Sequence, residues 1–152
     1  MAEKPGMEQV YEALVQRAAE ARKAAYCPYS GFAVGAALLC GDGTVYPGCN
    51  IENAALSPGN CAERTAFFRA VGDGKRDFLA IAVVGGAAGK EPTEFCPPCG
   101  VCRQVIREFC KPGFTVLLSD GKKIQRYTLA ELLPLSFGPE QLRESGDHHE
   151  SL

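Results

Sequence analysis

The sequence predicts a three-layer α/β/α fold built on a central five-stranded mixed sheet. Segments with helical spacing of apolar residues alternate with short apolar runs of strand length, in the order α-β-β-α-β-α-β-β-α. Helices interleaved with strands in this way favour one sheet with helices on its two faces. The length of 152 residues, with 46% hydrophobic and 22% charged residues, is typical of a globular protein with one hydrophobic core.

Four segments are expected to be helical, and each has a recognisable start or stop. The expected ranges are 7–26, 61–71, 99–109 and 128–133. Pro28 ends the first range because proline cannot continue a helix. Asn60 is a plausible N-cap for the second helix and Gly72 its stop. Thr128 is expected to cap the short fourth helix.

Five runs are expected to be strands. Their ranges are 33–40, 44–46, 78–84, 115–118 and 124–127. The turn Gly41-Asp42-Gly43 predicts a hairpin between the first two runs, and Asp120-Gly121 predicts another between the last two. The run 78–84 is apolar throughout, which indicates a strand covered on both faces. Together these segments predict a single catalytic domain over residues 7–137, followed by a polar tail over 138–152.

Composition and charge exclude several classes of function. The net charge of −2 gives no attraction for a phosphate backbone, so a nucleic-acid substrate is disfavoured. No apolar run approaches the roughly 20 residues that a membrane span needs, and residues 1–9 do not resemble a signal peptide. A cytoplasmic protein without a membrane partner is therefore expected. In that reducing compartment, eight cysteines are more naturally metal ligands or small buried side chains than disulfide partners.

Three of the cysteines are spaced to bind a metal ion. Cys99 and Cys102 lie three residues apart at the start of an expected helix, so both sulfur atoms project from its first turn. Cys61 stands at the start of another expected helix. The free N–H groups and the positive end of the dipole at a helix N-terminus favour the thiolate that zinc requires. We therefore expect Cys61, Cys99 and Cys102 to bind one Zn²⁺.

A site with three protein ligands is typical of catalytic zinc, because the fourth position stays open for water. Glu63, two residues after Cys61, can reach that water and is interpreted as the proton shuttle. Three thiolates and Zn²⁺ sum to a negative charge, which an arginine could offset by donating to sulfur. Arg64 and Arg103 are the candidates, and Arg64 is preferred.

The motifs Cys61-Ala62-Glu63 and Pro98-Cys99-Gly100-Val101-Cys102 together resemble the signature of the zinc nucleoside deaminases in its three-cysteine form. The similarity extends to residues 26–37, 48–54 and 131–137 and so covers nearly the whole chain. The chain resembles the cytidine deaminases of the small homotetrameric type. The activity that this implies is the hydrolytic deamination of free cytidine and deoxycytidine, with zinc as the cofactor.

The resemblance also implies roles for individual residues. Asn50 and Glu52 match positions that bind the ribose hydroxyl groups, and Phe32 matches an aromatic that packs against the pyrimidine. Ala62 is likewise expected to contact substrate. Phe137 matches a residue that closes the site of a neighbouring subunit. No basic clamp for phosphate is needed by a neutral nucleoside.

The sequence departs from the family pattern at three positions. Ala33 stands where proline is common, Leu56 stands where an aromatic is common, and Cys96 is an additional cysteine. Leu56 makes contacts between subunits less certain. Cys96 creates a rival ligand pair with Cys99, although Pro97 and Pro98 favour its exclusion from the helix.

Some alternatives remain open at this point. Cys61, Cys96, Cys99 and Cys102 could together close a structural zinc site with four sulfur atoms. A deaminase of a cytosine-containing antibiotic such as blasticidin shares the cysteine motifs, and a polynucleotide deaminase is disfavoured by charge. The remaining cysteines are expected to be small buried side chains; they are Cys27, Cys40, Cys49 and Cys110. His148 and His149 are expected to be exposed in the polar tail.

Overall fold

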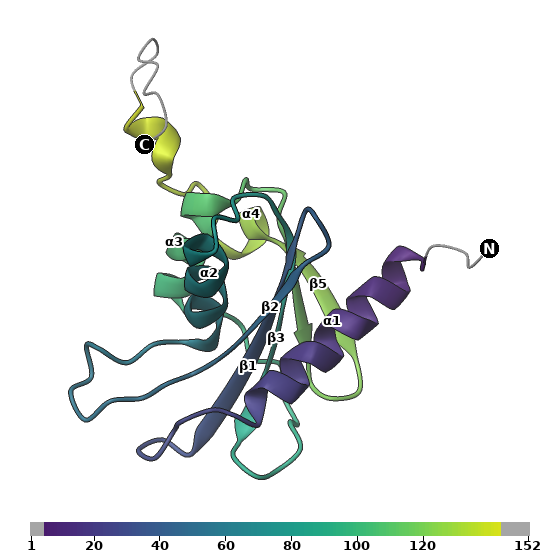
Figure 1. Cartoon of the computed structure of the whole chain (residues 1–152), viewed down its shortest axis with the longest axis vertical. Coiled ribbons are helices and arrows are strands. Elements are labelled where there is room, and N and C mark those ends of the chain that lie inside the picture. The colour runs from purple at the N-terminus through teal and green to yellow at the C-terminus, as the bar shows by residue number, and fades with distance from the viewer. Residues whose placement is uncertain (1–4, 144–152) are drawn as a thin grey trace.

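The computed structural model describes residues 5–143 and consists of one twisted sheet between two layers of helix (Figure 1). The helices are α1 (Met7–Arg22), α2 (Ala62–Gly72), α3 (Gly100–Phe109) and α4 (Leu129–Leu132), with a short 3₁₀ helix η1 (Pro139–Gln141). The strands are β1 (Phe32–Cys40), β2 (Val45–Cys49), β3 (Phe78–Ala87), β4 (Thr115–Ser119) and β5 (Ile124–Thr128). Residues 144–152, which include His148 and His149, lie outside the described residues.

The five strands are hydrogen-bonded in the order β2-β1-β3-β4-β5. The pairs β2–β1, β1–β3 and β4–β5 are antiparallel, whereas β3 and β4 are parallel. Parallel neighbours need a crossover connection, and α3 lies within this one. The predicted mixed sheet of five strands is therefore confirmed.

The alternation of side chains along β1 divides the core between the two faces of the sheet. Ala37 packs on one face with Leu14 and Ala18 of α1. Leu38, the next residue, packs on the other face with Phe67 of α2 and Ile106 of α3. Figure 1 shows α1 on one side of the sheet and α2 with α3 on the other. This arrangement confirms the three-layer α/β/α fold.

Aromatic packing holds α2 and α3 beside each other. The Phe67 ring lies 5.1 Å from that of Phe78 and 6.0 Å from that of Phe109, measured between centroids. Such pairs add about 0.5–1.5 kcal/mol each beyond the area they bury. Gly48 of β2 lets α2 approach closely, because a Cβ atom there would lie 2.5 Å from the carbonyl oxygen of Ala62. The start of α2 is therefore fixed against β2, and the end of α3 is packed against α2.

Some boundaries differ from those expected. The first helix ends at Arg22, and Tyr26 instead forms a β-bridge with Ile51. The N-cap of α2 is Cys61, so the assignment of Asn60 was wrong; the Asn60 amide donates to Thr65 Oγ1 at 3.2 Å. Competition between neighbouring residues for one cap position is decided by the backbone geometry of the preceding loop, which the sequence does not reveal.

The remaining differences lengthen strands. β2 runs to Cys49 and β3 to Ala87, because pairing with β1 continues past the apolar runs. Thr128 caps α4 as expected, since its hydroxyl accepts a hydrogen bond from the Glu131 N–H at 3.2 Å. Within residues 5–143, none of the helices is long and apolar enough to cross a membrane.

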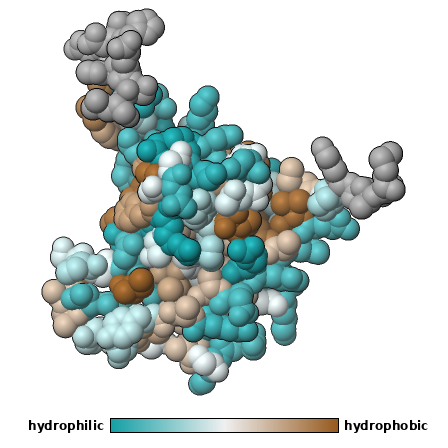
Figure 2. All heavy atoms as spheres, viewed as in Figure 1, coloured by the Kyte–Doolittle hydropathy of each residue, from teal (hydrophilic) through white to brown (hydrophobic). Residues whose placement is uncertain are grey.

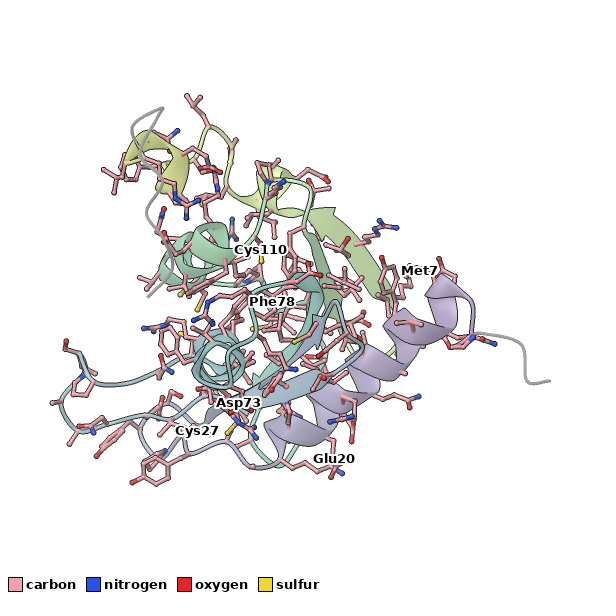
Figure 3. All side chains as sticks on the ribbon, turned by 45° about the horizontal axis from the view of Figure 1, so that its top comes forward. Met7, Glu20, Cys27, Asp73, Phe78 and Cys110 are labelled. Atoms are coloured by element: carbon pink, nitrogen blue, oxygen red, sulfur yellow. The ribbon has the colours of Figure 1, made fainter. Side chains whose placement is uncertain are left out.

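Figure 2 shows that the face seen in the same view is mainly hydrophilic, with isolated apolar groups. Figure 3 shows the side chains that fill the space between the sheet and the helices, with Phe78 and Cys110 among them. Cys40 and Cys110 are buried as expected, but Cys27 and Cys49 are only partly buried. The expectation of burial was wrong for these two cysteines: Cys49 is the last residue of β2 and Cys27 lies in the connection between α1 and β1, so both are outside the core clusters.

Candidate active site

Two helix N-termini bring three cysteines together. Cys61 is the N-cap of α2, Cys99 is the N-cap of α3, and Cys102 lies in the first turn of α3. The three Sγ atoms lie within 4.8 Å of one another, and those of Cys61 and Cys99 are 3.9 Å apart. Sulfur ligands at 2.3 Å in a tetrahedral site would be about 3.8 Å apart. The cluster Cys61, Cys99 and Cys102 therefore fits Zn²⁺.

The ionisation of the cluster also suits a cation. A hydrogen bond from Cys102, supported by the nearby Arg64, lowers the pKa of Cys61 to about 5. The bond to Cys61 and burial raise the pKa of Cys102. One thiolate therefore forms readily, and its negative charge opposes ionisation of its neighbour. Ionising all three sulfur atoms requires the positive charge of a metal ion.

Arg64 is the arginine that contacts the sulfur cluster. Its Nη2 atom donates to Cys61 Sγ at 3.4 Å, and this bond raises the pKa of the guanidinium. Its buried Nε atom has no hydrogen-bond partner among the described residues. Arg103, the other candidate, donates instead to the carbonyl oxygens of Pro98 at 2.7 Å and Leu132 at 2.6 Å. The geometry therefore favours Arg64 for charge compensation.

Glu63 lies in the first turn of α2 and faces the cluster from inside the protein. Its side chain is only 4% exposed, and its Oε2 atom lies 3.5 Å from Cys102 Sγ. Burial raises the pKa of this carboxyl group, with a further contribution from the charge on Cys61. A carboxyl group with a raised pKa can both accept and donate a proton near neutral pH, which is the property a proton shuttle needs.

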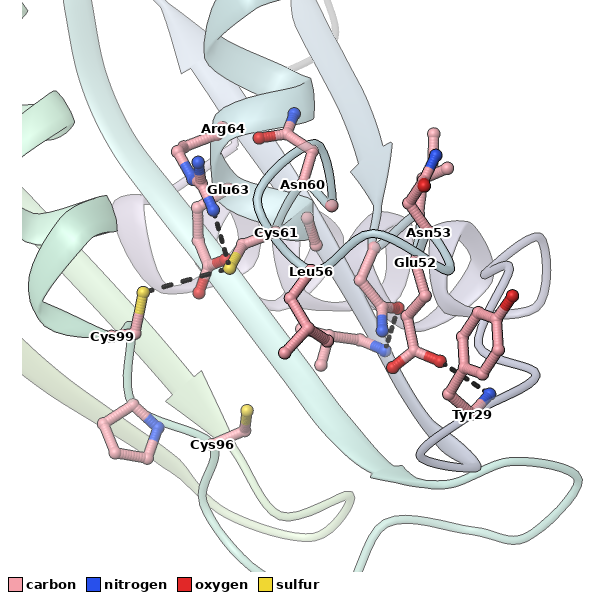
Figure 4. Close-up of a pocket in the computed structure, with 16 residues that line it drawn as sticks. Tyr29, Glu52, Asn53, Leu56, Asn60, Cys61, Glu63, Arg64, Cys96 and Cys99 are labelled. Carbon is pink, nitrogen blue, oxygen red and sulfur yellow. Dashed lines mark hydrogen bonds between the residues drawn. The ribbon is translucent and has the colours of Figure 1, made fainter.

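A cavity of about 420 Å³ opens beside the cluster (Figure 4). This volume lies in the range of small-molecule sites. The lining comes from the turn before β1, from β1, from the loop between β2 and α2, from the start of α2 and from the loop before α3. The lining residues are Tyr29, Val34, Asn50, Ile51, Glu52, Asn53, Leu56, Gly59, Asn60, Cys61, Ala62, Glu63, Arg64, Cys96, Pro97 and Cys99.

Glu52 and Asn50 line this cavity away from the sulfur cluster. The Glu52 Oε1 atom accepts hydrogen bonds from the N–H groups of Tyr29 at 3.0 Å and Ser30 at 3.1 Å. The Ser30 side chain lowers the pKa of Glu52 most, and the N–H groups of Ser30 and Tyr29 lower it further. The Oε2 atom has no hydrogen bond to another described residue. Glu52 is thus an oriented carboxylate with an oxygen free to bind a hydroxyl group.

The Asn50 amide is already engaged with the backbone. Its Oδ1 atom accepts from the Val34 N–H at 2.8 Å, and its Nδ2 atom donates to the Phe32 carbonyl oxygen at 2.8 Å. Each of these atoms can make one further hydrogen bond. Asn50 therefore fixes the start of β1 against the end of β2 while keeping one donor and one acceptor for a ligand.

The other expected substrate-binding residues are not all in the cavity of this single chain. Ala62 lines it, whereas Phe32 is 45% exposed and lies outside its lining, near Gly85 and Cys96. Phe137 is 57% exposed and lies beyond α3, where its carbonyl oxygen accepts a hydrogen bond from Gln104. The structure thus gathers Glu63, Ala62, Asn50 and Glu52 and leaves the two phenylalanines outside.

Cys96 lines the cavity but does not belong to the three-sulfur cluster. Its side chain lies against Gly85, and burial raises the pKa of its thiol to about 11. The rival ligand pair Cys96–Cys99 and the closed site with four sulfur atoms therefore receive no support among the described residues. Cys96 therefore lines the cavity as an uncharged thiol.

The sequence reasoning missed several lining residues. Tyr29 and Val34 lie in residues 26–37 and Asn53 lies in residues 48–54, two segments of the family resemblance, but no individual role was expected for any of the three. The signal available was the position of Tyr29 in a turn just before a strand, where binding residues are common. Leu56, one of the departures from the family pattern, is 91% exposed at the rim of the cavity.

The fold and site together define a class: an α/β protein with three cysteines placed to bind zinc and a buried carboxylic acid beside them. The model of the cytidine and deoxycytidylate deaminase zinc-binding region matches residues 8–118. The chain therefore belongs to this family and is a zinc-dependent deaminase.

Individual relatives agree with this assignment. A cytidine deaminase from Sporosarcina psychrophila is 54% identical over 132 residues, which cover 86% of this chain and 93% of the relative. One from Halalkalibacterium halodurans is 50% identical, over 86% of this chain and 96% of the relative. The crystal structure of cytidine deaminase from Burkholderia pseudomallei has a TM-score of 0.76 and 46% identity, and it covers 83% of this chain and 98% of that one. Similarity of this extent spans both the sheet and the site.

Proposed function

We propose that this protein catalyses the hydrolytic deamination of free cytidine and deoxycytidine to uridine and deoxyuridine, with release of ammonia, as a step of pyrimidine salvage. The observation that carries the proposal is the position of Glu63. This buried carboxyl group lies 3.5 Å from the thiol Cys102, inside a cavity that also presents the oriented carboxylate Glu52. Relatives named cytidine deaminase support the choice of substrate.

Cys61, Cys99 and Cys102 are the proposed zinc ligands. When bound there, Zn²⁺ supplies a water of lowered pKa as the nucleophile. Glu63 takes a proton from the attacking water and delivers it to N3 of the pyrimidine ring. Attack of the water oxygen at C4 gives a tetrahedral carbon, and Glu63 then carries the proton of the new C4 hydroxyl to the amino group, which leaves as ammonia while the C4 carbonyl of the product forms. Arg64 offsets the negative charge of the thiolates.

The rest of the cavity suits a nucleoside. Glu52 and Asn50 are proposed to bind the ribose hydroxyl groups, and Ala62 is proposed to contact the base. Phe32 is proposed to pack against the pyrimidine. Arg64 is the single cationic residue among those that line the cavity, and it faces Cys61 rather than the far end. A phosphate group would therefore meet Glu52 without a basic partner, which favours the nucleoside over the nucleotide.

Assembly is proposed to complete the site. Exposed apolar side chains lie on the loop before α2, on both zinc helices and in the C-terminal segment. They include Leu56 (91% exposed), Phe68 (50%), Val101 (58%) and Phe137 (57%). These side chains are the proposed contacts with other copies of the chain. We expect a homotetramer in which Phe137 of one chain closes the cavity of a neighbour.

Two further assignments accompany the function. Residues 7–137 are proposed to be one catalytic domain, with a polar tail over 138–152. The protein is proposed to act in the cytoplasm, because three thiolate ligands must stay reduced. Sedimentation of the purified protein tests the tetramer.

Incubation with cytidine, deoxycytidine, cytidine monophosphate and blasticidin in parallel, followed by absorbance and ammonia release, tests the activity. Rapid turnover of both nucleosides and slow turnover of the other two compounds is expected. Preferential turnover of blasticidin would assign the protein to antibiotic inactivation. Preferential turnover of the monophosphate would contradict the reading of the cavity as lacking a phosphate site.

A further inference from the structure

The second half of α3 carries a buried arginine that the proposed reaction does not use. Arg107 is only 6% exposed and lies five residues after Cys102 on the same helix. A charge that loses its water must find hydrogen-bonded partners in the protein. The partners of Arg107 therefore indicate what it holds in place.

All the side-chain partners of Arg107 come from the C-terminal segment. Its Nη1 and Nη2 atoms donate to the two carboxylate oxygens of Glu140, at 3.2 and 2.7 Å. Its Nε atom donates to Ser136 Oγ at 2.9 Å. Gly138 lies between these partners, and a Cβ atom there would collide with the guanidinium. Residues 136–140 thus wrap around one planar cation, in the bidentate geometry that arginine alone provides.

Two neighbouring residues of α3 bind the same part of the chain. The Gln104 amide donates to the Phe137 carbonyl oxygen at 3.0 Å. Arg103 donates to the Leu132 carbonyl oxygen at 2.6 Å and also to that of Pro98, which directly precedes Cys99. One helix therefore ties residues 132–140 to the backbone at the zinc site.

The polar contacts fix the backbone of this segment while its apolar side chains remain outside. Leu135 is fully exposed and has a φ of +48°, a left-handed conformation that costs energy for a leucine. Phe137 is 57% exposed although it is flanked by residues that bind Arg107. The segment lies at the edge of the molecule beyond α3 (Figure 1). The strained backbone at Leu135 and the exposed side chains of Leu135 and Phe137 indicate that this segment contacts another molecule.

We propose that the Arg107–Glu140 pair is a clamp that positions Phe137 for insertion into the site of a neighbouring copy of the chain. The clamp rests on the proposed function in one respect, the role of Phe137. Arg107 and Glu140 are positioning residues, because neither lines the cavity of its own chain. A segment released from the clamp would still carry Phe137 but would hold it in many orientations. The free energy needed to order this segment at each binding event would weaken substrate binding.

The first test is Glu140→Gln, which keeps the shape of the side chain and removes the ion pair. The expected result is a KM for cytidine raised on the order of tenfold, with kcat within about twofold. Zinc content and sedimentation should not change. Glu108→Gln, the same substitution at an exposed position on α3, is the matched control and should leave KM unaltered. Arg107→Lys, which keeps the charge and loses the bidentate geometry, should reproduce the rise in KM.

Phe137→Ala separates the clamp from the proposed function. A raised KM in Phe137→Ala with a normal KM in both Glu140→Gln and Arg107→Lys would overturn the clamp and leave the function standing. A normal KM in Phe137→Ala would instead refute the role of Phe137 on which the clamp rests. A purely structural role would lower the melting temperature of the clamp variants without changing KM at a temperature where they are folded.

A mixed oligomer tests action between chains. Chains carrying both Glu63→Gln and Glu140→Gln, co-expressed in excess with unaltered chains, have no functional site of their own. The unaltered sites in these oligomers should show the raised KM, whereas a partner carrying Glu63→Gln alone should leave it normal. An equal KM in the two mixtures would show that the clamp does not act on a neighbour.

Discussion

The Nη2 atom of Arg64 lies 3.4 Å from the Sγ atom of Cys61, three residues earlier in sequence. Between them in sequence is Glu63, whose side chain turns toward the interior. Four residues at one helix start thus include a ligand, an acid and a compensating cation around the same point. The acid and the cation can be tested separately.

Glu63→Gln should abolish most turnover without releasing zinc. The amide keeps the shape of the side chain but cannot carry a proton, so kcat should fall by roughly a hundredfold to ten-thousandfold. Steady-state kinetics and metal analysis on the same sample make the measurement, with the exposed Glu94→Gln as the control. An active, zinc-loaded Glu63→Gln protein would refute the role assigned to this residue.

Arg64→Gln should weaken zinc binding. Removing the guanidinium leaves the negative charge of the three thiolates without a partner, and loss of such a group costs roughly 10–100-fold in metal affinity. Competition with a chromophoric chelator measures the change. Arg69→Gln, farther along the same helix, is the control because its guanidinium contacts the Pro47 carbonyl oxygen instead. Equal zinc affinity in the two variants would contradict charge compensation by Arg64.

Glu52→Gln should raise the KM for cytidine by roughly tenfold to a hundredfold, the cost of losing a hydrogen bond to a charged acceptor. Glutamine retains the Oε1 atom that accepts from Tyr29 and Ser30, so the local backbone should stay in place. The comparison substrate is 2′,3′-dideoxycytidine, which lacks the 2′ and 3′ hydroxyl groups of the sugar. If its KM rises by the same factor, Glu52 does not bind either of these hydroxyl groups.

The pH dependence of stability should report the Arg107–Glu140 pair. The hydrogen bond from Arg107 lowers the pKa of Glu140 below its unfolded value, so the pair stabilises the folded state above about pH 5. This contribution is lost as the pH falls through the lowered folded pKa. Denaturant titrations of the unaltered protein and Glu140→Gln should therefore differ at pH 7 and converge at low pH. A difference independent of pH would show that the carboxylate charge contributes nothing.

The sequence was sufficient for the zinc ligands because their chemistry is local. Cys99 and Cys102 share one helical turn, and Cys61 needs only a second helix start nearby. Glu63 and Arg64 lie two and three residues after Cys61, so their places were predictable to within a turn of helix. The strands were equally local, since their apolar runs and glycine turns lie within short stretches of the chain.

The sequence could not decide questions that depend on residues far apart. It offered Arg64 and Arg103 as candidates for charge compensation and favoured Arg64, but only the packing of α3 against residue 132 shows that Arg103 is directed away from sulfur. It offered Cys96 as a rival ligand, and only the contact with Gly85 of β3 shows that this thiol lines the cavity outside the sulfur cluster. These choices are made by contacts that no spacing encodes.

The spaced cysteines and the glutamate beside Cys61 thus determined, by themselves, the kind of chemistry this protein performs. The tertiary structure decided which groups share that site: a cavity with Glu52 and Asn50 in its lining, and two phenylalanines outside it. The physical reason is the separation along the sequence over which each kind of interaction acts. Ligand spacing, helix caps and turns act over a few residues, whereas burial, charge pairing and the clamp on residues 136–140 arise only when distant segments pack together.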